Sequence, residues 1–215
     1  IYGEQFIRFF TDKNFDVSYI KKSALSSTGC SLVTVETCGK NRICMVSGAN
    51  MDYTAQDVFG LEKLLASNDV IVTQGEMRFE VVRALAGLCV KYGKKFIFNP
   101  APARELSDEV LQSVYVLTPN ETELGIIVGR KLTSRDDFVS AAKQLVARGV
   151  KNVVVTLGAS GSLLVNDKET LYVGAYKVNA VDTVGAGDSF TGSLAAFVDA
   201  GERLFEAVRK SAAVG

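Results

Sequence analysis

The chain has no histidine among its 215 residues. This absence excludes Ser-His-Asp and Cys-His hydrolases, and it excludes metal sites that depend on imidazole ligands. It also removes the side chain that enzymes most often use as a general base. Any acid–base chemistry must therefore use carboxylates, lysine, tyrosine or cysteine.

Net charge and long apolar runs are also absent. The chain has 24 Lys and Arg residues against 24 Asp and Glu residues, so its formal net charge is zero. This balance argues against nucleic acid or an anionic membrane as a partner, and no apolar run approaches the length of a membrane span. With 47% hydrophobic residues, the composition is that of a soluble globular protein, and we expect one domain over residues 1–215.

Cysteine is scarce, and the cysteines are not spaced as in a metal-binding motif. Cys30, Cys38, Cys44 and Cys89 form no Cys-x-x-Cys pair. A zinc site is therefore disfavoured, and reduced thiols in strands or in the core are the expected state. Reduced thiols predict a cytoplasmic location, with the nucleus as a further possibility.

Four short apolar runs alternate with stretches of helical periodicity. Continuous apolar strands that alternate with helices are typical of a parallel sheet covered on both faces. We therefore predict an α/β fold, a mostly parallel three-layer α/β/α sheet. The predicted strands are 70–72, 95–98, 114–117 and 153–155, and the predicted helices are 78–92, 105–112, 121–128 and 135–148.

A hairpin near the start of the chain does not fit this alternation. Two strand-like runs, 29–36 and 42–47, are joined by the turn-rich segment 37–41. We expect this 29–47 hairpin to project from the sheet as a separate flap. The remaining predicted elements are a helix at 2–12, a helix at 55–66 capped by Thr54, and short strands at 162–165 and 171–173.

A glycine-rich turn, residues 181–187, runs directly into a helix with apolar periodicity that Gly201 ends. The small residues Gly185, Ala186 and Gly187 let backbone N–H groups gather at the helix N-terminus, where they suit a phosphate or an oxyanion. Asp188 follows in the first turn and can take a proton from an attacking hydroxyl. The alternative is that Asp188 only caps its helix.

Polar residues follow each apolar run. They include Gln74-Gly75-Glu76, Asn99 to Pro102, Thr118 to Glu123, and Thr156 to Gly161. Each segment alone is ordinary turn chemistry. Ligands of open α/β sheets bind at the carboxyl ends of the strands, so the coincidence of these segments predicts a site there.

The predicted chemistry is phosphoryl transfer, which needs oriented N–H donors and metal-bound oxygens. Asn120 and Glu123 lie one helical turn apart and can present oxygens to Mg²⁺ through its waters. The alternative for this pair is a helix-start motif with surface acids. The chain has no G-x-x-x-x-G-K-[ST] motif, which excludes a P-loop NTPase, and the lack of G-x-G-x-x-G weakens a nicotinamide oxidoreductase.

At these motifs the chain resembles the ribokinase-like (phosphofructokinase-B type) carbohydrate kinase family, over essentially its whole length. The last motif marks the family most specifically. The matching segments, in family order, are Gly39 to Ile43 with Ser47 to Asn50, Gln74 to Glu76, Phe98 to Ala103, Thr118 to Glu123, Thr156 to Gly158, and Asp182 to Asp188.

The resemblance implies a role for each site residue. Asp188 is the catalytic base and contacts the sugar's primary hydroxyl, and the amides of Gly185, Ala186 and Gly187 form the anion hole. Glu76 contacts the sugar, and Glu123 holds Mg²⁺ through water. Residues on the ATP side are Asn120, Thr156, Gly158, Gly161 and Gly187, and a monovalent-cation site for K⁺ includes Asp182 and the Val184 carbonyl.

The activity implied is ATP-dependent phosphorylation of D-ribose at O5, which gives ribose 5-phosphate and ADP. By the same resemblance the 29–47 hairpin is part of a small β lid that closes over the sugar. The partners implied are ribose, ATP and a second copy of the chain paired through this lid. A kinase for another small sugar or a nucleoside is the nearest alternative. A non-catalytic remnant that binds nucleotide weakly or only dimerises is an alternative from a different class.

The chain departs from the family pattern at both ends and at Gly75. The family begins with a strand that carries a sugar-binding Asp, followed by a Gly-Gly-Lys-Gly-Ala-Asn segment, and it ends with a segment that completes the cation site and the adenine pocket. Gly75 stands where a larger apolar residue is usual. We therefore expect a domain that is incomplete at both ends. We also expect a protein of residues 1–215 alone to be poorly soluble or partly folded, and to have no detectable ribose kinase activity.

Overall fold

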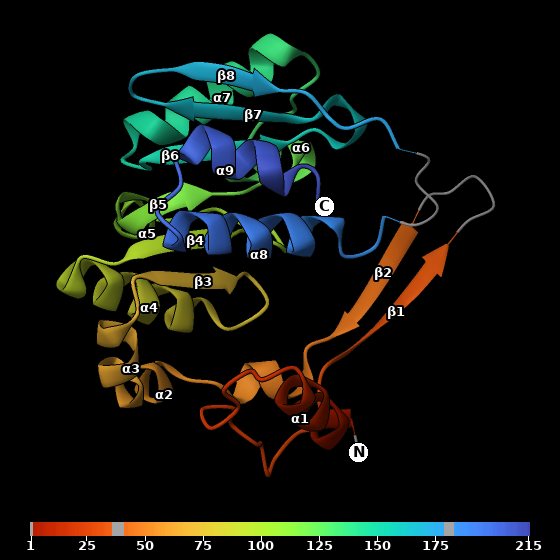
Figure 1. Ribbon diagram of the computed structural model, residues 1–215, viewed down its shortest axis with the longest axis vertical. Coiled ribbons are helices and arrows are strands. Elements are labelled where there is room, and N and C mark those ends of the chain that lie inside the picture. The colour runs from red at the N-terminus through yellow and green to blue at the C-terminus, as the bar shows by residue number, and fades with distance from the viewer. Residues whose placement is uncertain (1, 36–40, 179–182) are drawn as a thin grey trace.

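The computed structural model describes residues 2–35, 41–178 and 183–215, and its centre is a six-stranded sheet (Figure 1). The strands lie in chain order, the first four parallel and the last two antiparallel to their neighbours. The predicted α/β fold with a mostly parallel sheet is confirmed. The strands are β3 (Val70–Gln74), β4 (Lys95–Asn99), β5 (Val114–Leu117), β6 (Asn152–Thr156), β7 (Ser162–Asn166) and β8 (Thr170–Val173).

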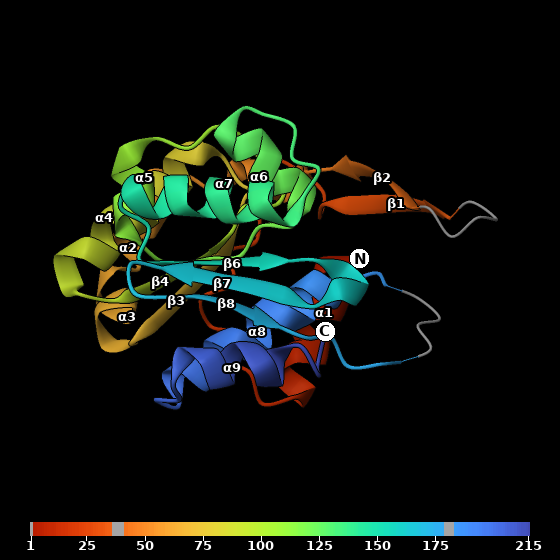
Figure 2. The same ribbon diagram turned by 90° about the horizontal axis from the view of Figure 1, so that it is seen from above.

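Helices cover both faces of this sheet (Figure 2). Alternate residues of a strand point to opposite faces, so Phe96 and Phe98 pack in one core and Ile97 packs in the other. Both faces of the sheet are apolar, and each needs its own helical layer. One layer holds α4 (Phe79–Tyr92), α5 (Asp108–Ser113), α6 (Glu121–Val128) and α7 (Arg135–Ala147), and the other holds α8 (Ala186–Asp199) and α9 (Leu204–Ser211).

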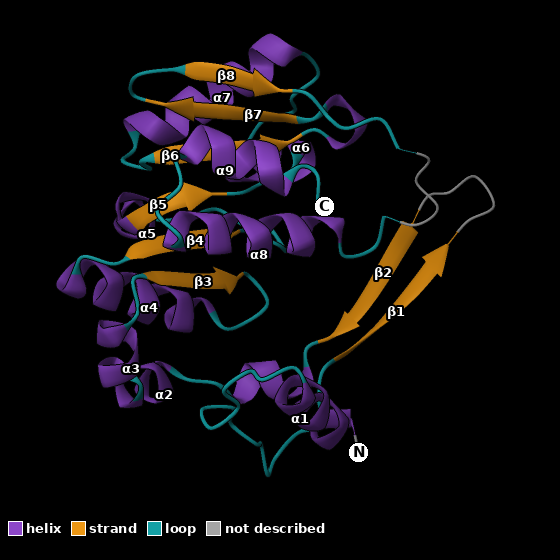
Figure 3. Ribbon diagram, in the orientation of Figure 1, coloured by secondary structure: helices purple, strands orange, loops and turns teal. Residues whose placement is uncertain are grey.

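The N-terminal part lies outside the six-stranded sheet (Figure 3). Strands β1 (Cys30–Val35) and β2 (Asn41–Val46) pair antiparallel as predicted, while their predicted connection at 37–41 falls mostly outside the described residues. This two-stranded sheet projects from the body of the molecule. Leu32 and Val46 on it are exposed, and α1 (Tyr2–Asp12) has no buried residue.

Two predicted helices differ from the structure, and a third helix was not predicted. The predicted helix 55–66 is two helices, α2 (Ala55–Gly60) and α3 (Glu62–Ser67), because Gly60 weakens the helix and Leu61 leaves helical geometry. Helix α5 begins at Asp108 rather than 105, and α9 was not predicted. Thr54 caps α2 as predicted.

Among the helices of the described ranges, none combines the length and apolar character that crossing a membrane requires.

Candidate active site

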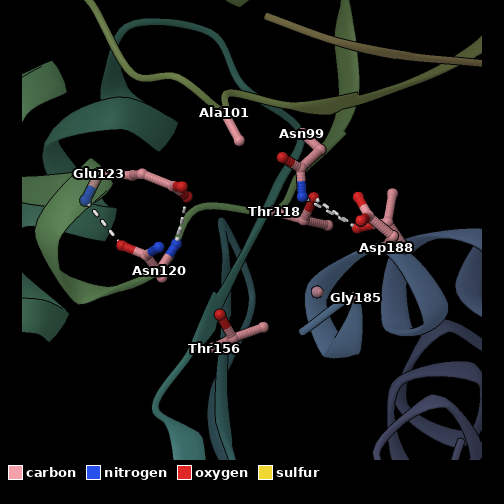
Figure 4. A pocket seen from close by; sticks show the side chains of 10 residues that line it. Asn99, Ala101, Thr118, Asn120, Glu123, Thr156, Gly185 and Asp188 are labelled. Carbon is pink, nitrogen blue, oxygen red and sulfur yellow. Dashed lines mark hydrogen bonds between the residues drawn. The ribbon is translucent and has the colours of Figure 1, made fainter. Parts of the chain in front are cut away.

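A pocket of about 120 Å³ opens at the carboxyl ends of β4, β5 and β6, beside the N-terminus of α8 (Figure 4). The parallel strands bring polar residues that are distant in sequence to this one edge of the sheet. The lining residues are Asn99, Ala101, Thr118, Asn120, Glu123, Thr156, Gly185, Gly187, Asp188 and Thr191.

The first turn of α8 carries Asp188. Gly185 is the N-cap residue at φ +79°, in the left-handed region that favours glycine. Asp188 is the third residue of the helix, and its Oδ1 accepts a hydrogen bond from the side chain of Gln74. The alternative in which Asp188 only caps the helix is therefore wrong, because the chain enters the helix through a glycine. The Asp188 carboxylate lines the pocket instead.

Beneath Asp188 lies a buried polar cluster of Asn99, Thr118 and Thr191. Asn99 Nδ2 donates to Thr191 Oγ1 at 3.1 Å, and the hydroxyl oxygens of Thr118 and Thr191 lie 3.3 Å apart. The cluster connects β4, the end of β5 and α8. Asn99 Oδ1 is buried and has no hydrogen-bond partner within the described ranges, and it faces the Glu123 side of the pocket (Figure 4). A buried acceptor without a partner costs free energy, so this oxygen is suited to a donor supplied by a ligand.

Asn120 and Glu123 form a capping box at the start of α6. Glu123 N–H donates to Asn120 Oδ1, and Asn120 N–H donates to Glu123 Oε2, both at 2.8 Å. The helix-start alternative is therefore realised, but Glu123 also lines the pocket. Burial raises the pKa of the Glu123 carboxyl, and the hydrogen bond from Asn120 opposes that shift. Burial disfavours the charged form of a carboxyl group, and a nearby cation stabilises that charged form.

The oxygen groups of the pocket fit a hydrated Mg²⁺. Mg²⁺ prefers oxygen ligands and keeps several of its waters, and those waters donate hydrogen bonds. The Glu123 carboxylate and the unpartnered Asn99 Oδ1, which points toward the Glu123 side, are both acceptors at this pocket. No cluster of three or more His, Cys, Asp or Glu side chains that could enclose a metal occurs in the described part of the chain.

Not every predicted site residue reaches the pocket. Glu76 lies in the loop after β3 and is not among the lining residues of the described chain. Gly158 opens the short 3₁₀ helix η2 (Gly158–Ser160), and Gly161 closes it. Val184 is exposed beside Gly185, and Asp182 lies outside the described residues. The predicted residues that come together here are Gly185, Gly187, Asp188, Asn120, Glu123 and Thr156, while Ala186 is not among the lining residues of the described chain.

The structure gives a reason for Gly75. Its N–H donates to the Ala101 carbonyl at 2.9 Å, so the end of β3 lies against the loop after β4. A Cβ at this position would lie 2.9 Å from Pro102 O and 3.1 Å from Ala101 O, and both are backbone atoms that cannot turn aside. A larger residue at position 75 would therefore push this loop away from the pocket that Ala101 lines.

Sequence reasoning missed Thr191. It lies three residues after Asp188, on the same face of α8, and it is buried at 4% exposure. The signal was present, because a threonine within the apolar stripe of a helix requires a buried partner. That partner, Asn99, is 92 residues away in the chain and was not identifiable by spacing.

Comparison with known proteins agrees with this geometry. Residues 2–215 match the pfkB family of carbohydrate kinases. The chain belongs to this family. It is 34% identical to a ribokinase of Staphylococcus aureus over 184 residues, which are 86% of this chain and 60% of the relative. It is also 34% identical to a deoxyribokinase of Salmonella typhi over 196 residues, 91% of this chain and 64% of the relative. The chain thus spans less than two thirds of the length of these relatives.

Solved structures show the same fold. A ribokinase from Thermotoga maritima is similar with a TM-score of 0.86 at 33% identity, over 99% of this chain and 69% of that one. An Arabidopsis thaliana ribokinase complexed with ribose and ATP has a TM-score of 0.78 at 28% identity, over 88% of this chain and 62% of that one. A phosphofructokinase-2 from Escherichia coli in complex with potassium has a TM-score of 0.77 at 28% identity, over 98% of this chain and 70% of that one.

Proposed function

We propose that this protein is a sugar kinase that transfers the γ-phosphoryl group of ATP to O5 of D-ribose and releases ribose 5-phosphate and ADP. One observation carries the proposal. A single pocket joins the Asp188 carboxylate, the glycine-led N-terminus of α8, and the oxygen groups of Asn99 and Glu123. These groups are a base, an anion site and a cation site, which are the three requirements of this reaction.

The proposed mechanism assigns one task to each part. Asp188 accepts the proton of the sugar hydroxyl as its oxygen attacks the γ-phosphorus. The N–H groups at the start of α8 stabilise the charge on the transferred group, because they point along the positive end of the helix dipole. Glu123 and Asn99 would hold hydrated Mg²⁺, and the ion would offset the charge of the phosphates. Asn120 and Thr156 lie on the opposite side of the pocket from α8 and bind the nucleotide phosphates.

Ribose as the substrate is supported by the ribokinase relatives, while the deoxyribokinase relative at equal identity names the competing substrate. The complete gene product should be assayed with ATP and equal concentrations of ribose, 2-deoxyribose, fructose and adenosine. We expect the highest kcat/KM with ribose. A higher value with 2-deoxyribose or adenosine would replace ribose while leaving the kinase assignment in place.

The finer parts of the proposal concern K⁺, assembly and location. A potassium complex of a structural relative supports K⁺ binding, and the site that the sequence predicts includes the Val184 carbonyl and Asp182. The exposed apolar residues Leu32 and Val46 on the β1–β2 sheet support its pairing with a second copy as a lid, since a lone two-stranded sheet is only marginally stable. We propose a cytoplasmic homodimer activated by K⁺.

Changing Glu123 to glutamine tests the magnesium side of the site. The Mg²⁺ concentration for half-maximal rate should rise roughly 10-fold or more, because the change removes a charge that attracts the hydrated ion. The glutamine oxygen can still accept the Asn120 N–H, so the melting temperature should stay near that of the parent. Glu121→Gln is the matched control, since Glu121 lies in the same helical turn outside this pocket. An unchanged Mg²⁺ requirement in Glu123→Gln would place Glu123 outside the metal site.

A further inference from the structure

Gln74, the last residue of β3, holds one oxygen of Asp188. Its Nε2 donates to Asp188 Oδ1 at 2.5 Å. An ionised carboxylate only accepts hydrogen bonds, so the nitrogen of the Gln74 amide must face Asp188. Within the described residues nothing binds the second oxygen, Asp188 Oδ2. The two carboxylate oxygens therefore have different surroundings.

A second strand-end amide acts beside the first. Gln74 and Asn99 are register partners on the neighbouring strands β3 and β4. Asn99 donates to Thr191 while Gln74 donates to Asp188. Asp188 and Thr191 are three residues apart and share one face of α8. The two amides thus attach the first turns of α8 to the sheet and set the rotation of the helix about its axis.

The backbone around Gln74 is itself held in place. Gly75 N–H donates to the Ala101 carbonyl at 2.9 Å, and Arg104 Nη2 donates to the Gly75 carbonyl at 3.4 Å. Gln74 is half-buried and does not line the pocket. The backbone that carries the Gln74 amide is therefore held in place, and the amide contacts Asp188 without itself lining the pocket.

We propose that Gln74 is a positioning residue for the base. Its amide fixes Oδ1 of Asp188 and leaves Oδ2 to accept the proton of the substrate hydroxyl. This inference rests on the proposed function, because it takes Asp188 as the base of a kinase. Orientation of reacting groups supplies much of the acceleration in phosphoryl transfer, so a base that is free to rotate loses rate without losing substrate affinity.

Replacing Gln74 with methionine, which keeps the length and removes the donor, is the first test. The kcat of the complete gene product should fall about 10- to 100-fold, with KM for sugar and for ATP within a few-fold of the parent. In an Asp188→Asn background, Gln74→Met should cause little further loss, because no base remains to be positioned. Gln144→Met on the exposed surface of α7 is the matched control and should leave kcat unchanged.

A charge-swapped pair tests the contact without relying on turnover. Gln74→Glu alone places two carboxylates against each other, so its melting temperature should fall below that of Gln74→Met. Combining it with Asp188→Asn restores a donor–acceptor pair in the reverse direction, because the new amide at position 188 can then donate to the new carboxylate at position 74. We expect the melting temperature of this double variant to recover while turnover stays at the level of Asp188→Asn.

The outcomes separate this inference from the proposed function. Parental kcat in Gln74→Met, or an equal loss in the parent and Asp188→Asn backgrounds, would overturn the positioning role while the kinase assignment stands. A swapped pair without recovery of the melting temperature would overturn the contact itself. A parent enzyme that phosphorylates no sugar with ATP would overturn the proposed function, and the catalytic role of Gln74 with it.

Discussion

Asp188→Asn is expected to lower the turnover of the complete gene product by roughly 10²–10⁴-fold, because an amide cannot accept the hydroxyl proton. Affinity for sugar and ATP should persist, since asparagine has nearly the same shape as aspartate. The asparagine oxygen can still accept the hydrogen bond from Gln74, so the side chain can keep its place. Steady-state kinetics combined with calorimetric titration of ribose and nucleotide separates the loss of turnover from any loss of binding.

Asp199→Asn is the matched control for this change. Asp199 is the last residue of the same helix and is exposed. Removing its charge there should not lower stability, since carboxylates are unfavourable at helix C-termini. The control should keep parental turnover. Turnover of Asp188→Asn within a few-fold of the parent would reject Asp188 as the base.

Gly161→Ala is expected to destabilise the fold more than any other single change proposed for this chain. Gly161 has φ +91° between η2 and β7, a conformation that side chains rarely adopt. A Cβ there would lie 2.7 Å from Ala175 N and 2.9 Å from Gly174 C, and it would also collide with the Val173 carbonyl. All three are backbone atoms at the end of β8 and just after it, so this segment would have to move away from the start of β7.

The expected loss is about 3 kcal/mol or more, which combines the backbone strain with the displaced strand. For a domain of this size, that corresponds to a melting temperature lower by roughly 6–12 °C. Gly174→Ala is the matched control, because a Cβ at Gly174 meets no atom within 4 Å and its φ is not positive. If both variants melt at the same temperature, the close approach at Gly161 is not a feature of the folded protein in solution.

The sheet was predictable because its strands are marked by local composition. The runs at 70–72, 95–98, 114–117 and 153–155 are apolar without interruption, apart from Lys95 at the start of one run, which is the pattern of strands buried on both faces. The antiparallel addition of β7 and β8 was not predicted, since short strands have the same composition in either direction. It follows from the tight connection through η2, which is too short for a parallel crossover.

Two helical errors have physical causes. The periodicity over 55–66 continues through Gly60 and Leu61, but tertiary packing favours two short helices and the low helix propensity of glycine permits the break. Helix α9 is amphipathic and buries Ala207 and Val208. Its periodicity was available in the sequence, and the prediction stopped at Gly201 without testing the residues that follow.

The site was partly predictable because strand ends gather at one edge of a parallel sheet. That rule is enough to predict that Asn120, Thr156 and Asp188 meet at one place. It could not assign the contact between Gln74 and Asp188, because the contact depends on how α8 crosses β3 and the two residues are 114 positions apart. It also left Glu123 with two alternatives, and the structure shows that one carboxylate oxygen caps α6 while the side chain still lines the pocket.

Product analysis of the complete gene product tests the central claim most directly. The protein is incubated with Mg²⁺, K⁺, ATP and D-ribose, and the products are followed by ³¹P and ¹³C nuclear magnetic resonance. The account predicts that ADP and a ribose monophosphate accumulate in equal amounts, that the phosphate is on O5, and that Asp188→Asn slows the formation of both by roughly 10²–10⁴-fold. ADP release that does not depend on the sugar, or no transfer to any sugar or nucleoside tested, would contradict it.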